Sequence, residues 1–97
     1  MYARQTAFQG DASKLDAMLD QFRGNISTLR QLPGCKGVRF LANRQTGKVI
    51  VVTLWESAEA ATAAEGTTSQ LRSRGAQTFG AGTPTSEVYE ALVNEDF

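Results

Sequence analysis

The side chains that could take part in chemistry are few and of restricted type. The 97 residues contain no histidine and one cysteine, Cys35. A Ser-His-Asp triad, a Cys-His pair and an HExxH zinc helix are therefore excluded, as is a histidine ligand to haem. A single cysteine forms neither an intrachain disulfide nor a CxxC motif. Proton transfer near neutral pH would have to use a carboxylate, Tyr, Lys, Cys or the substrate itself.

The candidate site residues all belong to segments predicted as strands. We predict catalytic roles for three of them, Trp55, Arg39 and Tyr89. The residues predicted to contact a substrate are Tyr2, Arg4, Thr53, Val51 and Phe40. No metal ligand set is predicted, because the chain lacks histidine and has only one cysteine.

Two arginines on the predicted strands could stabilise a substrate anion, which is the chemical reason to expect a site there. A guanidinium within a few ångströms of a phenol lowers the pKa of that phenol and favours the phenolate. Arg4 and Arg39 are the candidates for this role. Structural alternatives stay open: Trp55 could be a packing anchor, Arg39 an ion-pair residue, and Tyr2 and Tyr89 packing residues in a core or dimer. The indole N–H of the Trp needs a partner in either case.

These residues must be positioned by a strand predicted over residues 48–55, which the sequence Val-Ile-Val-Val-Thr-Leu-Trp fills almost without interruption. Branching at Cβ favours a strand, and a run this apolar is typical of a strand covered on both faces. We expect Ile50, Val52 and Leu54 to pack under the helices. The odd-numbered residues from Val49 to Trp55 are then expected to face the other way.

The remaining elements follow from periodicity and turn signals. An apolar stripe at helical spacing predicts a helix over 14–31, opened by a capping box at Ser13 and Asp16. Ser57 is expected to cap a second helix, which breaks at 66–68 and resumes over 69–79. Three further strands are predicted, at 2–9, 35–43 and 87–93, with a hairpin connection at 44–47.

The order β-α-β-β-α-β predicts an α+β fold of the ferredoxin-like kind, with a four-stranded antiparallel sheet in a single domain over residues 1–97. Two helices can cover only one face of such a sheet. The uncovered apolar face is too extensive for a monomer, so we expect a two-fold homodimer. An apolar cavity with a few polar groups would be a small-molecule site.

Charge and composition restrict the partners. Ten basic and ten acidic side chains cancel, so no nucleic-acid or acidic-lipid partner is expected. No apolar stretch approaches the roughly 20 residues needed to span a bilayer, and the first residues do not form a signal sequence. We therefore expect a cytoplasmic protein without a membrane partner.

The element order, the segment Leu32-Pro-Gly-Cys-Lys-Gly37 and the strand ending in Leu54-Trp-Glu-Ser57 together resemble the antibiotic biosynthesis monooxygenase-like proteins of the dimeric α+β barrel superfamily. The resemblance covers about residues 2–93. It implies a monooxygenase that oxidises an aromatic polyketide or quinol-type small molecule with molecular oxygen, without metal or flavin. The substrate anion supplies the electrons. Trp55 matches the strand-end Trp of the family, and no other position carries a role over.

Two alternatives accompany this reading. One is a non-redox dimeric barrel of a biosynthetic pathway, which binds a small molecule or acts as a cyclase or isomerase. The other is a structural dimer without a cavity. A haem-degrading branch of the superfamily uses an Asn on the first strand and a His ligand, and this sequence has no His and no Asn in residues 2–9.

Overall fold

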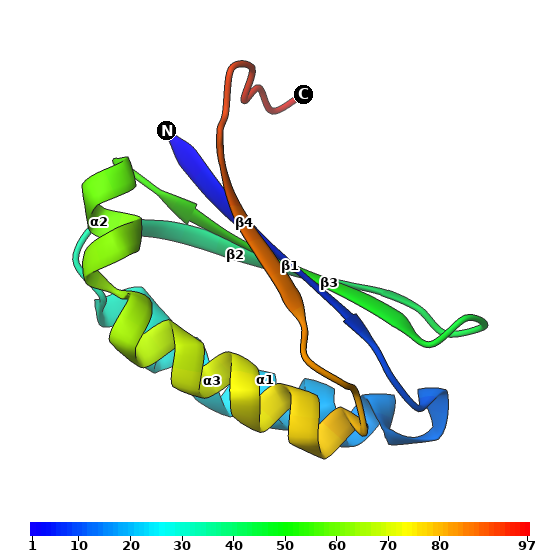
Figure 1. Ribbon diagram of the computed structural model, residues 1–97. Helices are drawn as coiled ribbons and strands as arrows, with labels where there is room; N and C mark the ends of the chain where they lie inside the picture. The colour runs from blue at the N-terminus through cyan, green and yellow to red at the C-terminus, as the bar shows by residue number, and fades with distance from the viewer.

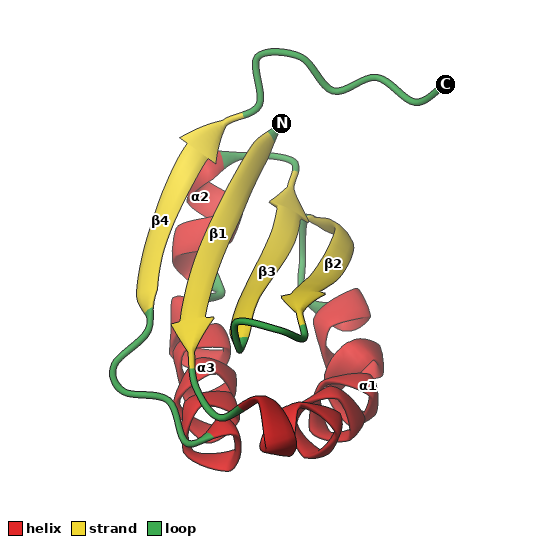
Figure 2. Cartoon of the chain, turned by 90° about the vertical axis from the view of Figure 1, so that its right-hand side faces the viewer, coloured by secondary structure: helices red, strands yellow, loops and turns green.

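A four-stranded antiparallel sheet is the framework of the protein. The computed structural model describes all residues from 1 to 97. The strands are β1 (Tyr2–Gln9), β2 (Cys35–Asn43), β3 (Lys48–Trp55) and β4 (Thr85–Glu90). They lie in the order β2-β3-β1-β4, which Figure 2 shows from right to left. The predicted β-α-β-β-α-β arrangement is confirmed.

The helices all lie on one side of this sheet (Figure 1). They are a short 3-10 turn η1 (Ala12–Lys14) followed by α1 (Leu15–Gln31), and then α2 (Ala58–Ala63) and α3 (Glu65–Phe79). None of them has the length and apolar character required to cross a lipid bilayer. The sheet therefore has one face toward the helices and one open face.

The odd-numbered side chains of β3 face the helices. Val49 and Trp55 are completely buried and Thr53 is only 7% exposed, whereas the even-numbered residues of 50–54 are half-buried. Since successive side chains of a strand point to opposite faces, the even-numbered ones lie on the open face. The prediction that they pack under the helices is wrong.

The position of Trp55 explains this orientation. Its indole ring packs in a cluster with Ala61 and Ala64, whose small side chains leave room for it between α2 and the sheet. Its N–H donates a buried hydrogen bond of 2.9 Å to the hydroxyl of Thr53. A buried indole N–H needs such an acceptor, so Thr53 belongs on the inner face of the strand.

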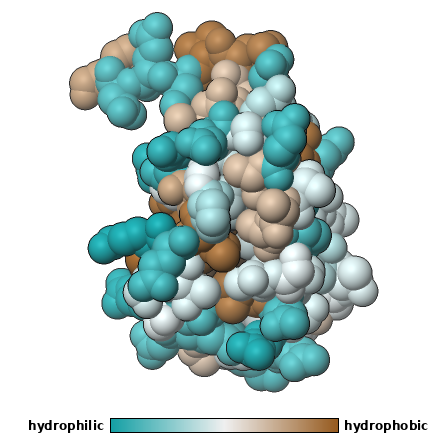
Figure 3. Space-filling model, turned by 90° about the vertical axis from the view of Figure 1, so that its left-hand side faces the viewer, coloured by the Kyte–Doolittle hydropathy of each residue, from teal (hydrophilic) through white to brown (hydrophobic).

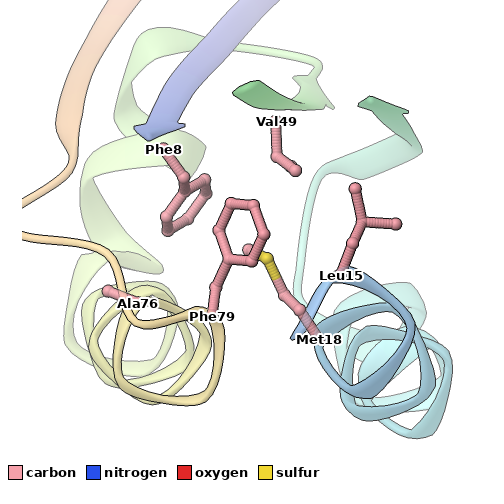
Figure 4. Close-up of a cluster of buried hydrophobic side chains, with 6 residues drawn as sticks. All are labelled: Phe8, Leu15, Met18, Val49, Ala76 and Phe79. Carbon is pink, nitrogen blue, oxygen red and sulfur yellow. The ribbon is translucent and has the colours of Figure 1, made fainter. Parts of the chain in front are cut away.

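The main core lies at the other end of the molecule, where α1 and α3 meet the sheet. Its buried side chains are Phe8, Leu15, Met18, Val49, Ala76 and Phe79. Figure 4 shows the ring of Phe79 extending from α3 toward the sheet, with Phe8 and Met18 on either side of it. This cluster fixes both long helices against β1 and β3.

The helix ends confirm one predicted cap and correct another. Ser57 accepts a hydrogen bond of 3.1 Å from the backbone N–H of Ala60, as predicted. Ser13 does not cap α1. Instead Asp11 accepts from the backbone N–H and the hydroxyl of Ser13 at 2.9 and 2.6 Å. These hydrogen bonds lower the pKa of the Asp11 carboxyl. They also cap η1, which begins at Ala12, before the predicted helix start at residue 14.

Two predicted boundaries also shift. The break between α2 and α3 falls at Ala64 and not at residues 66–68. Strand β4 covers Thr85–Glu90 and not residues 87–93, because its partner β1 begins at Tyr2, opposite Glu90. Beyond that point only Met1 remains, and its carbonyl accepts a single hydrogen bond of 2.8 Å from the backbone N–H of Ala91.

Two glycines provide a matched test of this fold. Gly34 has φ of +79°, and a Cβ there would lie 2.6 Å from the Cβ of Ala60. Gly24 lies exposed within α1, with nothing near its absent Cβ. We expect Gly34→Ala to reduce the free energy of unfolding by about 2 kcal/mol. Gly24→Ala should raise it by about 0.5–1 kcal/mol. Urea unfolding measures both, and equal effects would contradict the structure.

Candidate active site

A cavity lies between the sheet and the two long helices. It is lined from β1 and β3 on one side and from α1 and α3 on the other. Its apolar wall consists of Phe8, Met18, Phe22, Leu29, Val51 and Leu71. Its polar side chains are Arg4, Thr6, Gln21, Asn25, Thr53, Thr68 and Arg72, and Gly75 completes the lining. Figure 3 shows hydrophobic residues at two places on one face of the molecule, one at its upper edge and one in its middle.

The cavity is narrow in this conformation. Its volume is about 60 Å³, well below the roughly 300–1,000 Å³ of pockets that hold drug-sized ligands. A flat aromatic ring could enter only if α1 and α3 moved apart. Where α1 faces α3, the flexible side chain of Met18 lies against Gly75.

Two arginines, Arg4 and Arg72, form the charged side of the cavity, and both pair with Glu65 next to it. The guanidinium of Arg4 lies 3.0 Å from one carboxylate oxygen of Glu65, and Arg72 pairs with the other oxygen. Arg72 also donates to the hydroxyl of Thr68 at 3.5 Å. The arginine side chains are 13% and 16% exposed, and that of Glu65 is 41% exposed. The cations are therefore more deeply buried than their shared anion.

Strand β4 supports Arg4 from its other side. Arg4 donates a hydrogen bond of 3.1 Å to the hydroxyl of Ser86, which also lies 3.2 Å from the hydroxyl of Thr6. The antiparallel register places Thr6 directly opposite Ser86. The guanidinium is thus positioned by both the sheet and α3.

Two polar atoms around the cavity have no partner. The Nε of Arg4 and the Oε1 of Gln21 are buried and make no hydrogen bond. Buried polar groups are nearly always paired, and each exception needs an explanation. A ligand that accepts a hydrogen bond from the first and donates one to the second would satisfy both.

Four of the predicted site residues lie at or against the cavity. Arg4, Val51 and Thr53 line it. Phe40 of β2 does not line the cavity but packs against the lining residue Phe22, with the two ring centroids 5.1 Å apart. Arg4, Val51 and Thr53 all lie on the side of the sheet that faces the helices. We had predicted the opposite face for the two residues of β3, but the residues share one face as expected.

Trp55 and Tyr2 lie beside the cavity, in the cluster under α2. The Trp does not line the cavity but holds the hydroxyl of Thr53, which does. The hydroxyl of Tyr2 lies 3.5 Å from a carboxylate oxygen of Glu90. The structure thus gives Trp55 a supporting position and places Tyr2 next to it.

Arg39 and Tyr89 lie on the open face, away from the cavity. Arg39 pairs with Val52 across the strands, and its guanidinium donates to the carbonyl of Val38 at 2.9 Å. The Tyr89 hydroxyl donates to the Glu87 carboxylate at 2.7 Å. This hydrogen bond raises the pKa of the phenol. The structure does not bring these two residues together with the other candidates.

Sequence reasoning missed the residues contributed by the helices. Arg72 and Thr68 are four residues apart on α3, and Gln21 and Asn25 are four residues apart on α1. This spacing places each pair on one side of its helix. Polar residues repeating every four positions next to an apolar stripe were the available signal.

Cys35 and the carboxylates offer no metal centre. No group of three or more Cys, Asp or Glu side chains is placed to hold a metal ion. Cys35 is partly buried, and this burial raises the pKa of its thiol. The thiol lies in the cluster around Trp55 and not in the cavity.

The chain belongs to the antibiotic biosynthesis monooxygenase family. Residues 1–74 match the family model of that description, and the resemblance inferred from the sequence is confirmed. The protein Rv2557 of Mycobacterium tuberculosis is 36% identical over 91 residues, which are 93% of this chain and 40% of that protein. The chain thus spans less than half the length of the curated relatives it matches.

Solved structures of monooxygenases share the fold. The monooxygenase from the gene ActVA-Orf6 of Streptomyces coelicolor, in complex with the ligand nanaomycin D, superposes with a TM-score of 0.74. It is 18% identical, with 97% of this chain and 92% of that chain covered. SnoaB, a cofactor-independent oxygenase from Streptomyces nogalater, gives a TM-score of 0.73 at 14% identity, with 96% and 94% covered.

The hydrogen bond between Trp55 and Thr53 can be tested directly. Thr53→Val keeps the shape of the side chain but leaves the buried indole N–H unpaired, which costs about 1–3 kcal/mol of unfolding free energy. Thr53→Ser keeps the acceptor and loses one methyl group, at a cost of up to about 1 kcal/mol. Urea unfolding compares the two variants. A Val variant as stable as the Ser variant would show that the hydroxyl is not needed.

Proposed function

We propose that the protein is a cofactor-independent monooxygenase that oxidises an aromatic, enolisable or quinol-type small molecule in the cavity between the sheet and the helices. Membership of the family and the apolar cavity with an arginine on one side support this function. The observation that carries it is the unpaired Nε–H of Arg4, a buried cationic donor without an acceptor.

This donor acts on the ionisation of the substrate. An enol or phenol oxygen placed against Arg4 would be stabilised as its anion, because a nearby positive charge favours the charged form of an acid. The apolar wall excludes water and strengthens this interaction. An electron-rich anion is the form of the substrate that can react with oxygen.

The electrons balance without a separate reductant. In an anthrone-like substrate, both C–H bonds of the activated CH₂ group break and one oxygen atom forms a carbonyl on that carbon. In a quinol, one oxygen atom converts a ring C–H into C–OH, and the two hydroxyl groups lose their hydrogens to give the quinone. The second oxygen atom of O₂ leaves with the two hydrogens as water. Since the substrate provides all the reducing electrons, the proposed reaction requires neither a metal nor a flavin.

Oxygen consumption tests this function. Metal-stripped protein is expected to consume oxygen with anthrone- or hydroquinone-like substrates. Arg4→Gln should lower kcat/KM at least tenfold, since a charge-assisted hydrogen bond to the anion is lost. Arg23→Gln removes an exposed arginine of α1 that lies outside the cavity and should leave the rate unchanged. An absence of turnover across a broad substrate panel would contradict the proposal.

A non-redox binding function is the second candidate. Glu65, the carboxylate next to the cavity, is paired with two arginines and is therefore poorly suited to act as a general base. A site without a free base suits ligand binding as well as substrate-driven oxidation. Saturable binding of the same panel without oxygen uptake would favour this second function.

We also propose that the open face of the sheet is the interface of a homodimer. Its apolar residues are Ile50, Val52 and Leu54 of β3, Leu41 of β2, Ala3 and Ala7 of β1 and Tyr89 of β4. Leu41 and Tyr89 are 54% and 46% exposed. A second copy related by a two-fold axis would bury the same patch on both chains. Arg39 lies on the same face, opposite Val52, and would be part of this interface.

A charge at the centre of the open face tests the dimer. Sedimentation at micromolar concentration is expected to show a dimer for the unchanged chain and a monomer for Val52→Lys, since an ammonium group opposite Arg39 would be an unpaired like charge in the interface. Gln70→Lys adds the same charge on the exposed side of α3 and should remain dimeric. A monomeric unchanged chain would contradict the proposal.

A further inference from the structure

We propose that Arg4 and Arg72 form a binding site for an ionised oxygen acid of the ligand, and that Glu65 occupies this site in the free protein. The ligand would be a small aromatic acid whose anion displaces the Glu65 carboxylate. This inference rests on the proposed function only in taking the cavity as the ligand site. It requires no oxidation.

The exposure of the three side chains indicates which group can leave. Glu65 is 41% exposed, whereas the two arginines are 13% and 16% exposed. The carboxylate lies at the first residue of α3, directly after the break at Ala64. A rotation of its side chain would return it to water, where a carboxylate is well solvated. The buried guanidinium groups have no comparable route.

The local charge favours an incoming anion. Arg4 and Arg72 carry two positive charges and Glu65 one negative charge, which leaves one positive charge uncompensated. No Asp or Glu is among the 14 residues that line the cavity. Because the surrounding wall is largely apolar, this charge is weakly screened and attracts an acid more strongly than it would at the surface.

The unpaired atoms define the rest of the ligand. The Nε–H of Arg4 needs an acceptor in addition to Glu65, and the Oε1 of Gln21 on α1 needs a donor. An aromatic acid that also carries a hydroxyl group could supply both, with its ring against the apolar wall. A neutral aromatic amide of the same shape has no anion with which to displace Glu65.

Binding of a matched pair of probes tests the proposal. The probes are 4-hydroxybenzoate and 4-hydroxybenzamide, which have nearly the same shape and differ in charge at pH 7. The affinity of each is measured by NMR titration. The unchanged protein should bind the benzoate at least fivefold more tightly. Glu65→Gln removes the competing carboxylate and should increase this preference by a further five- to tenfold, since more of the protein is then competent to bind the anion.

Two more variants complete the experiment. Glu59→Gln makes the same change at an exposed glutamate of α2 outside the cavity and should alter the preference less than twofold. Arg72→Gln should abolish the preference for the benzoate. If Glu65→Gln does not fold, this variant alone tests whether the arginines bind the anion. An unchanged preference in Glu65→Gln, a retained preference in Arg72→Gln, or equal binding of both probes by the unchanged protein would overturn the proposal.

The result is independent of turnover. A protein that prefers the benzoate but consumes no oxygen with any substrate would contradict the proposed monooxygenase activity and support the anion site. A protein that consumes oxygen but binds both probes equally would contradict the anion site alone.

Discussion

The orientation of β3 determines where every other side chain of the sheet is placed. Trp55 fits beneath the small residues of α2, and its N–H reaches the hydroxyl of Thr53 two residues earlier on the same face. Shifting a strand by one residue would exchange its two faces. With the orientation of β3 fixed, the antiparallel register brings Arg4 of β1 opposite Thr53 and faces it toward the helices. The cavity follows from this one constraint.

The charged network around Arg4 is better explained by a site than by stability. Burying ion pairs between β1 and α3 costs desolvation free energy that their attraction often fails to recover. Apolar side chains of similar size would hold the sheet against α3 at least as well. The network joins β4, β1 and α3 through Ser86, Arg4 and Glu65, and it still leaves a buried donor unpaired. The proposed ligand would supply an acceptor for that donor, which the packing of the chain does not.

The sequence was sufficient to predict the strands, the long helices and their order, because β-branched runs, helical spacing and Gly-containing turns all agreed. It could not determine which face of β3 is inside. Both sides of residues 49–54 are apolar, so alternation gave no contrast, and Thr53 looked like a residue for the outer face. Its buried role depends on an indole N–H that only the folded chain places beside it. The same wrong choice of face for β3 led us to predict Arg39 and Tyr89 near the cavity. Glu65, the partner of Arg4, lies on α3, and no pattern in the sequence connects it to β1.

A crystal structure of the protein with an aromatic hydroquinone tests most directly whether the cavity between sheet and helices is the functional site. We expect the ring to lie between Phe22 and Val51, with one oxygen accepting a hydrogen bond from the Nε of Arg4. The long helices α1 and α3 should be further apart than in the free protein, because the cavity of about 60 Å³ is too small for the ring. A ligand bound on the open face of the sheet, with the cavity unchanged, would contradict this account.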